Sequence, residues 1–174
     1  MTRQSPSARA AAATNAHLSQ FGDDDLAYHE SGHAVVHHLN GGTVRRLSIG
    51  RADDPQRGCQ LAPRPATDAS ADPQAALAAS IAVLVGGEVA ATLHGTPHHL
   101  VTAGGRVDHE AALRAAASAG IGVDEARVMI DAAWSREHER LVEPSAWGLV
   151  ERLAQALLRD KVLDAPQIAD LLAQ

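Results

Sequence analysis

The sequence predicts a mainly helical domain that carries one small β-hairpin. Hydrophobic residues make up 45% of the chain but aromatic residues only 2%, so the core must consist mostly of alanine, leucine, valine and isoleucine. Such a composition favours closely packed helices over a large sheet. Segments with helical start and stop signals fill most of the sequence, and only residues 43–62 show the pattern of a hairpin. A length of 174 residues is typical of one domain with a hydrophobic core.

The N-terminal segment, residues 1–21, is expected to be disordered and to precede the folded domain at residues 22–174. Its first 20 residues contain no acidic residue and are rich in alanine, serine and arginine. Its longest apolar run is too short for a secretory signal peptide. A transit peptide has the same kind of composition, so a targeting role for this segment stays open. A polar terminus without packing partners is otherwise expected to fray.

The first helix is expected to begin at the aspartates of residues 23–25 and to end at the Asn-Gly-Gly sequence of residues 40–42. The aspartates supply an N-cap and a charge that favours the helix dipole, and Asn-Gly-Gly is a typical helix stop. The hairpin follows over residues 43–62, with a turn at the sequence DDPQRG. Residues 63–72 are rich in proline, alanine and aspartate, which predicts a linker.

The second helix is expected to run from the Asp-Pro signal at residues 72–73 to Gly95 and to be the central buried helix. Aspartate before proline is typical of a helix start, and the segment is apolar on most faces. The pair Gly86-Gly87 should cost about 1 kcal/mol per glycine relative to alanine, which indicates that another backbone comes close there. The longest apolar stretch, residues 75–85, is shorter than the roughly 20 residues of a membrane span, so no span is expected.

The rest of the chain predicts a loop and further helices. Residues 96–105, with the sequence TPHHLVTAGG, contain proline and a glycine pair and are expected to form the loop. Pro144 and the Asp-Ala-Pro sequence of residues 164–166 mark two of the later helix boundaries. The expected helices span residues 106–119, 123–141, 144–160 and 165–173.

Charge and cysteine content narrow the functional classes. The formal net charge is -6 and the chain has no run of lysine or arginine, so it lacks the electrostatic footprint of a protein that binds nucleic acid or an anionic membrane. Cys59 is the only cysteine, so no disulfide can form within the chain. This fits a reducing compartment, and with no membrane span expected it predicts a soluble protein of the cytoplasm.

The sequence HESGH at residues 29–33 has the spacing of a metal-binding motif with a catalytic base. On a helix, residues i and i+4 share a face, so His29 and His33 can both bind one metal ion. Neutral imidazoles suit zinc, and two of them hold it weakly, so a third protein ligand is expected. Glu30 lies about 100° around the helix from His29, where it can take a proton from a water that zinc activates. This spacing predicts a zinc site that hydrolyses amides, and the alternative is a solvated helix with incidental histidines.

The third ligand stays open on the residues alone. One class of zinc peptidase carries a further glycine and histidine after this motif, but Val36 and Leu39 stand at those positions, so that class is excluded. Two acidic residues remain as candidates. They are Glu88 in GGEVAA and Asp108 in TAGGRVDHEAALRAA.

Other polar residues near these motifs have simpler explanations than metal binding. His37 lies four residues beyond the second motif histidine, but a helix presents three ligands to one ion far less easily than two. The histidines at residues 98–99 are expected to be solvated, and His109 to be incidental. Glu110 is expected to be an exposed carboxylate rather than a partner of a ligand histidine. Cys59 is expected to be a buried small side chain.

The motif and its surroundings resemble the FtsH-type zinc metallopeptidases. AYHESGHAVV is similar to the zinc-site helix of that family, and VRRLSIGR…RGCQLAP to the hairpin that follows it. IAVLVGGEVAATLHG resembles the family's second long helix, and TAGGRVDHEAALRAA the segment that carries its third ligand, an aspartate, which falls on Asp108. AWGLVERLAQALLRDKVLDAPQIADLL resembles the closing helices, so the likeness covers about residues 24–173 in order. The sequence departs at Val107, where the family has asparagine.

The resemblance implies a helical, zincin-like peptidase domain. It implies that His29, His33 and Asp108 bind Zn²⁺, that Glu30 is the general base, and that the substrate is an unfolded or flexible polypeptide. The family couples its peptidase to an ATPase, but this sequence contains no GxxxxGK[ST] loop. The implied partners are therefore a polypeptide substrate, a separate ATPase for any ATP-driven unfolding, and further copies of the chain in a homo-oligomer. The alternative function is a metal-stabilised binding or regulatory module that has lost catalysis.

The hairpin at residues 43–62 allows one further interpretation. If one of its edges is exposed beside the zinc, an extended substrate could pair with that edge by strand addition. Such pairing recognises the backbone of the substrate rather than its side chains. It therefore predicts little preference for particular substrate sequences. A hairpin with a structural role alone is equally compatible with the sequence.

Overall fold

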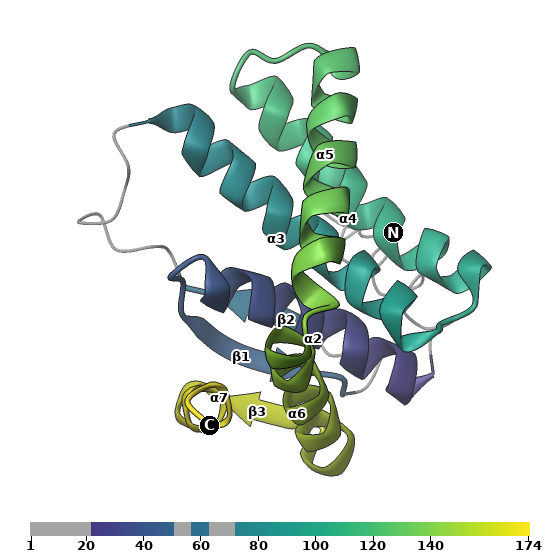
Figure 1. Ribbon diagram of the computed structural model, residues 1–174, viewed down its shortest axis with the longest axis vertical. Coiled ribbons are helices and arrows are strands. Elements are labelled where there is room, and N and C mark those ends of the chain that lie inside the picture. Colours follow the sequence, from purple (N-terminus) through teal and green to yellow (C-terminus); the bar gives the residue numbers. More distant parts are fainter. Residues whose placement is uncertain (1–21, 51–56, 63–71) are drawn as a thin grey trace, which may run out of the picture.

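The computed structural model describes residues 22–50, 57–62 and 72–174, which form a mainly helical domain with one small sheet (Figure 1). The fold class predicted from the sequence is confirmed, and the predicted hairpin is present. The expected disordered segment at residues 1–21 and nearly all of the expected linker lie outside the described residues. The elements are α2 (Asp23–Leu39), β1 (Val44–Ser48), β2 (Gly58–Leu61), α3 (Pro73–His94), α4 (His98–Ser118), α5 (Val123–Leu141), α6 (Pro144–Asp160), β3 (Val162–Asp164) and α7 (Ala165–Leu172).

Helix α2 begins where the sequence predicts, but the expected N-cap was wrong. Gly22 occupies the cap, and the aspartates fill the first turn, where their charge still favours the helix dipole. Their carboxylates bind other elements instead of capping the backbone. Asp23 Oδ2 accepts a hydrogen bond from Lys161 Nζ at 3.0 Å, and Asp25 Oδ1 accepts one from Thr96 Oγ1 at 2.8 Å. The start of α2 is therefore fixed by tertiary contacts.

The other end of α2 is held by α5. The helix ends at Asn40, as predicted, and Arg140 reaches this end from α5. Its Nη2 donates to the Leu39 carbonyl at 2.8 Å and its Nη1 donates to Asn40 Oδ1 at 3.0 Å. The carboxylate of Glu137, which is 1% exposed, accepts from the same guanidinium at 3.4 Å. A buried carboxylate thus orients the arginine that satisfies a carbonyl at the end of α2.

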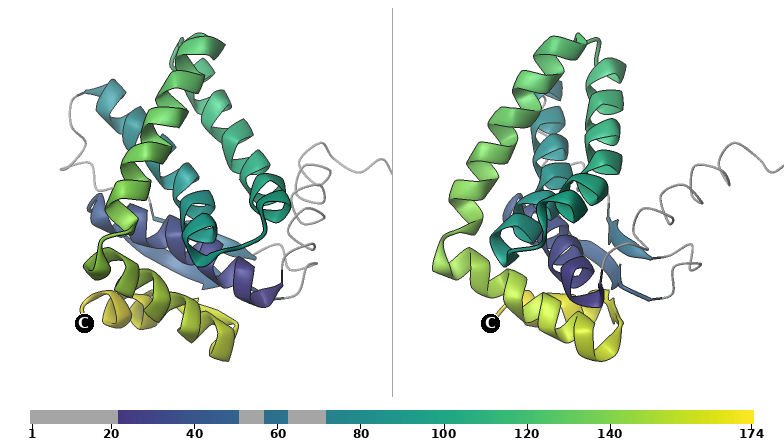
Figure 2. Two further views of the ribbon diagram at one scale, coloured as in Figure 1. Left: turned by 45° about the vertical axis from the view of Figure 1, so that its right-hand side comes forward. Right: turned by 90° about the vertical axis from the view of Figure 1, so that its right-hand side faces the viewer.

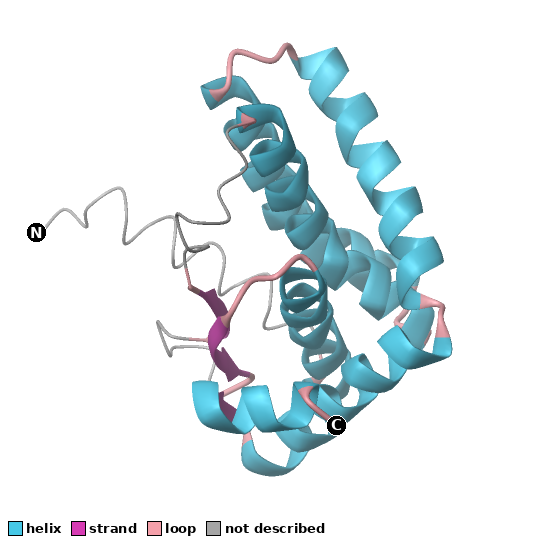
Figure 3. Cartoon of the chain, turned by 60° about the vertical axis from the view of Figure 1, so that its left-hand side comes forward, coloured by secondary structure: helices cyan, strands magenta, loops and turns pink. Residues whose placement is uncertain are grey.

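The sheet contains a third strand that the sequence did not predict. β1 lies in the middle, pairs antiparallel with β2 as the hairpin predicts, and pairs antiparallel with β3 on its other side (Figure 3). Leu47 of β1 stands opposite Cys59 on β2 and Leu163 on β3. β3 has three residues, too few for a recognisable alternation, and it depends on the partner strand for its conformation.

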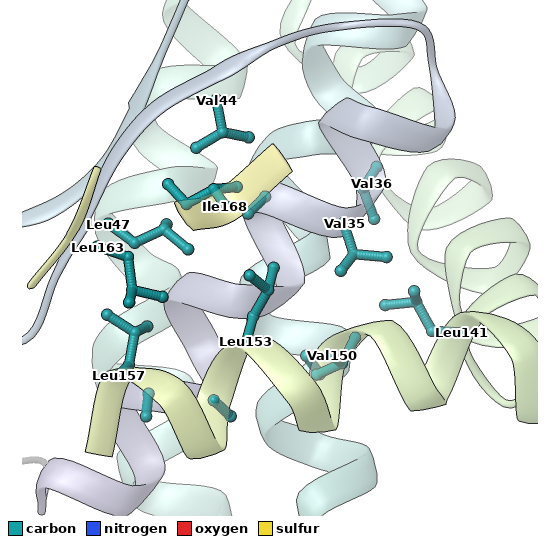
Figure 4. Close-up of a cluster of buried hydrophobic side chains, with 14 of the residues drawn as sticks. Val35, Val36, Val44, Leu47, Leu141, Val150, Leu153, Leu157, Leu163 and Ile168 are labelled. Atoms are coloured by element: carbon teal, nitrogen blue, oxygen red, sulfur yellow. The ribbon is translucent and has the colours of Figure 1, made fainter. Parts of the chain in front are cut away.

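Helix α2 lies between two groups of elements. α3, α4 and α5 lie on one side of it, and α6, β3 and α7 lie on the other (Figures 1 and 2). A first hydrophobic cluster joins α2 to the sheet, α6 and α7. Its labelled members in Figure 4 are Val35, Val36, Val44, Leu47, Leu141, Val150, Leu153, Leu157, Leu163 and Ile168. A smaller cluster joins α3, α4 and α5 and contains Leu77, Ile81, Val85, Ala112, Ile130 and Ala133.

Helix α3 is the central helix that the sequence predicts. Asp72 caps it by accepting from the Gln74 amide at 2.9 Å, and Gly95 ends it in a left-handed conformation. The predicted close approach at the glycine pair is also confirmed. A Cβ atom at Gly32 of α2 would collide with the carbonyl oxygen of Gly86, so the backbones of α2 and α3 touch at this crossing. Glycine stands here because no side chain fits.

Helix α3, with 22 residues, is twice as long as the apolar stretch 75–85. Among the described residues it is the one helix whose length and composition would allow a membrane span. In its most apolar window, 56% of the residues are buried inside the protein. The core helix of a soluble protein passes the same test of length and composition.

The predicted loop at residues 96–105 was wrong. Only its first two residues precede α4, which begins at His98 with Pro97 as its N-cap and continues without a break through Gly104 and Gly105. The glycine pair resembles a loop signal because glycine disfavours an isolated helix. Here both glycines are buried, and a Cβ at Gly105 would lie 2.7 Å from Glu88 Oε2 of α3. Close packing between α3 and α4 therefore outweighs the low helix propensity.

Candidate metal centre

The structure brings together the two motif histidines and one aspartate from a distant part of the sequence. His29 and His33 lie one turn apart on α2, and their Nε2 atoms are 3.1 Å apart. Asp108 comes from α4, and its Oδ2 lies 3.3 Å from Nε2 of His29 and 3.4 Å from Nε2 of His33. Among the described residues, these three side chains form the one cluster of histidine, cysteine or acidic groups that could hold a metal ion.

The triangle has the dimensions of one face of a tetrahedral zinc site. Zinc binds imidazole nitrogen and carboxylate oxygen at about 2.0–2.1 Å, which gives a regular tetrahedron edges of about 3.3–3.4 Å. The observed edges are 3.1, 3.3 and 3.4 Å. Two histidines and one carboxylate are also a donor set found in catalytic zinc sites that keep one position for water or substrate. The residues present therefore fit the zinc ion that the sequence predicts.

Helix α3 orients the second histidine. Nδ1 of His33 donates a hydrogen bond to the Val83 carbonyl at 2.7 Å, which leaves the Nε2 lone pair for the metal. One turn further along α3, a Cβ at Gly87 would collide with the imidazole of His33 and lie 2.8 Å from Cε1 of His29. The second glycine of the predicted pair thus makes room for the ligand side chains rather than for a backbone.

Charge coupling within the triangle is strong because the groups are buried. Burial raises the pKa of Asp108, but the two histidines outweigh it and hold that pKa well below its usual range. Burial lowers the pKa of His33, but the charge and hydrogen bond of Asp108, the charge of Glu30 and the Val83 carbonyl together raise it to about 9. When no metal is bound, His33 therefore carries a proton at neutral pH.

Zinc binding should release this proton. Because His33 must be neutral to bind zinc and its pKa is about 9, we expect about one proton released per zinc ion at pH 7.5, and an apparent affinity that rises about tenfold per unit between pH 7 and 8.5. The check is calorimetric titration of chelator-stripped protein in two buffers of different ionisation enthalpy. Asp124→Ala is the matched control, since it removes a fully exposed carboxylate on α5 and should release the same number of protons as the wild type. No proton release by the wild type would contradict the coupling.

Glu30 lies beside the triangle rather than in it. Its side chain is 4% exposed, and its carboxylate accepts a hydrogen bond from the backbone amide of Cys59 on β2. Burial raises the pKa of Glu30, the histidines oppose this effect, and Asp108 adds to it. A carboxylate with a raised pKa is better matched to accept and return a proton near neutral pH.

A cleft of about 220 Å³ opens over these groups. Its polar floor consists of the three candidate ligands and Glu30, and β2 forms one of its walls. The remaining lining is Arg57, Gly58, Cys59, Leu61, Val83, Leu84, Gly104 and Val107. The cleft can therefore hold a small, largely apolar part of a substrate directly against the candidate metal ligands.

The other candidate third ligand is engaged elsewhere. Glu88 Oε2 lies 2.8 Å from Nε2 of His109, and Glu88 does not belong to the cluster that could hold a metal. The hydrogen bond from His109 to Glu88 raises the pKa of His109, and burial opposes this rise. His109 also lies outside the cluster that could hold a metal, and it contacts Glu88 instead. In the sequence, the contact between His109 and Glu88 is indicated only by spacing. His109 lies four residues after Gly105, so the two share one face of a helix.

The remaining polar residues agree with their simpler explanations, except that Cys59 is partly rather than fully buried. The ring of His37 is buried against Gly42, and the histidines at residues 98–99 are exposed at the start of α4. Glu110 is exposed and pairs with Arg114 at 3.8 Å. Burial, and then the charges of Glu30 and Asp108, raise the pKa of the Cys59 thiol well above its usual value, so it is not a nucleophile at neutral pH.

No family model matches this chain, and a search of curated proteins found no match. The description of the site therefore rests on its geometry and chemistry.

Proposed function

We propose that the protein is a zinc metallopeptidase that hydrolyses peptide bonds in unfolded or flexible polypeptides. One observation carries the proposal: the triangle of His29, His33 and Asp108 has the dimensions of a zinc site, and a buried glutamate lies next to it. A purely structural zinc site would need a fourth protein ligand and no base. The sequence resemblance to FtsH-type peptidases supports the same assignment.

Each group at the site would have a separate role in peptide hydrolysis. Zinc at this site would polarise the scissile carbonyl and lower the pKa of a bound water to about 7. Glu30 would accept a proton from the attacking water and return it to the leaving amine. The Cys59 amide keeps the carboxylate of Glu30 oriented while the proton is transferred. Gly58, which has a φ of 113°, lies against the same carboxylate and leaves space at the cleft.

The position of β2 supports an extended polypeptide as the substrate. β2 is an edge strand in the order β2-β1-β3, and its residues line the cleft. A substrate segment could add to this edge by backbone hydrogen bonds, which requires an unfolded or flexible chain. We further propose that a separate ATPase or a homo-oligomer would supply unfolding where a substrate is folded.

The test is cleavage of an unstructured fluorogenic polypeptide by zinc-loaded protein. We expect the wild type to cleave it, a chelator to stop cleavage, and Asp108→Ala to lose zinc affinity by more than the roughly 10–100-fold that loss of a ligand's hydrogen-bonded partner costs. Asp124→Ala is the matched control, because the Asp124 side chain is fully exposed on α5. Zinc binding by the wild type without cleavage would favour the non-catalytic module. No zinc binding would contradict the site itself.

A further inference from the structure

A pair of residues outside the candidate ligand set connects α3 to α4 close to Asp108. Oε2 of Glu88 on α3 lies 2.8 Å from Nε2 of His109 on α4, which places the two side chains in direct polar contact. The side chain of Glu88 is 20% exposed and that of His109 is 40% exposed, so the contact lies at the edge of the helix interface. His109 directly follows Asp108 in the sequence. The contact therefore acts on the turn of α4 that presents the third candidate ligand.

Gly105 makes this contact possible. A Cβ atom at this position would lie 2.7 Å from Oε2 and 3.1 Å from Cδ of Glu88, so the carboxylate occupies the space that a side chain would fill. Gly105 and His109 are four residues apart and therefore share one face of α4. Glu88 thus contacts both ends of the helical turn that contains Asp108.

The residue before Glu88 contacts the other two ligands. Gly87 packs directly against the imidazoles of His33 and His29, and the Val83 carbonyl one turn earlier accepts from His33. A single short segment of α3 therefore positions all three members of the triangle. The contact between Glu88 and His109 should therefore oppose a shift of Asp108 along or around the axis of α4 relative to the histidines.

We propose that Glu88 and His109 are positioning residues for the metal centre, and that their contact sets the place of Asp108 relative to His29 and His33. This inference rests on the proposed function only in requiring that the triangle binds zinc. The role is one of geometry, since Glu88 belongs neither to the cluster that could hold a metal nor to the lining of the cleft. Loss of a group that is hydrogen-bonded directly to a ligand typically costs 10–100-fold in metal affinity, so a pair that positions the residue beside a ligand should reach the lower end of this range.

The experiment measures zinc affinity by chelator competition for the wild type, Glu88→Ala, Glu88→Gln, His109→Ala and the double variant Glu88→Ala/His109→Ala. We expect Glu88→Ala and His109→Ala each to weaken zinc binding by about tenfold or more. Glu88→Gln should restore near wild-type affinity, because the amide oxygen can still accept from His109. The double variant should bind no more weakly than either single variant, because both remove one interaction.

The ligand-field spectrum of the cobalt-substituted protein supplies a readout of geometry. We expect the spectrum to change in Glu88→Ala and to return in Glu88→Gln. Glu110→Ala is the matched control, since it removes an exposed carboxylate from the same helix and should change neither readout. His109→Ala keeps the proposal testable if Glu88→Ala does not fold.

Unchanged affinity and spectrum in Glu88→Ala and His109→Ala would overturn the inference and leave the proposed function intact. Equal losses in Glu88→Ala and Glu88→Gln would also overturn it, because the charge of Glu88 rather than its place between Gly105 and His109 would then matter. Zinc binding without peptidase activity in the wild type would overturn the proposed function alone. A wild type that binds no zinc would overturn both.

Discussion

Replacement of Glu30 by glutamine should abolish peptide hydrolysis while leaving zinc bound. The carboxylate lies outside the triangle of candidate ligands, so its charge is not needed to hold the ion. The amide oxygen of glutamine can still accept from the Cys59 amide, so the side chain should keep its place. Glutamine cannot take up a proton, and loss of general acid–base catalysis typically slows a reaction by about 10²–10⁴-fold. The measurement is the cleavage rate of the fluorogenic polypeptide at equal zinc content.

Two controls separate chemistry from stability in this experiment. Glu139→Gln removes the charge of an exposed glutamate on α5 and should leave the rate unchanged. Because burial raises the pKa of Glu30, its ionised form is less favourable in the folded than in the unfolded protein, and this penalty is present at neutral pH. Glu30→Gln should therefore not lower the melting temperature. A variant that cleaves at the wild-type rate would show that another group is the base.

Replacement of Gly32 by alanine should strongly destabilise the fold. The added Cβ would collide with the Gly86 carbonyl oxygen and lie 2.9 Å from the carbonyl carbon. These are backbone atoms of α3, so no side chain can rotate away and the two helices must separate. Overpacking of a core typically costs 1–3 kcal/mol, and a backbone collision at the central crossing should cost about 3 kcal/mol or more. Urea unfolding of the zinc-free protein measures this loss.

The matched control is the same substitution at a helical glycine with room beside it. A Cβ at Gly148 of α6 would meet only Arg152 Nη1, at 3.5 Å, which is an ordinary contact. Gly148→Ala should therefore raise the free energy of unfolding by about 1 kcal/mol through helix propensity. If Gly32→Ala and Gly148→Ala changed stability alike, the contact between α2 and α3 would not be as close as the structure has it.

The part of the site on α2 could be predicted because its geometry is local. A helix fixes the relative directions of His29, Glu30 and His33 from their spacing alone. The third ligand lies on another helix, so the residues alone left Glu88 and Asp108 open, and the family resemblance favoured Asp108. In the structure Glu88 is engaged by His109, an interaction that requires α3 and α4 to be packed together.

The difference between local sequence signals and contacts with distant parts of the chain also explains which parts of the fold were predicted. Helices with caps in their own sequence, such as α3 with Asp72 and α7 with the Asp164 capping box, begin where the sequence predicts. β3 and the first turns of α4 were missed because partners elsewhere in the chain determine them. β3 needs the edge of β1, and α4 needs the surface of α3 against Gly105. Local sequence carries no record of such partners.

The central place of β1 has a consequence for the order of folding. β1 receives its second neighbour only when β3 is available, and the contact from Lys161 to Asp23 joins residues separated by 138 positions. Closing such long loops costs conformational entropy before any contact is gained, which slows folding. During synthesis, the helix with both motif histidines leaves the ribosome long before the strand that completes its surroundings. The domain therefore matures late, and an unfinished chain holds the HESGH motif without the core that supports it.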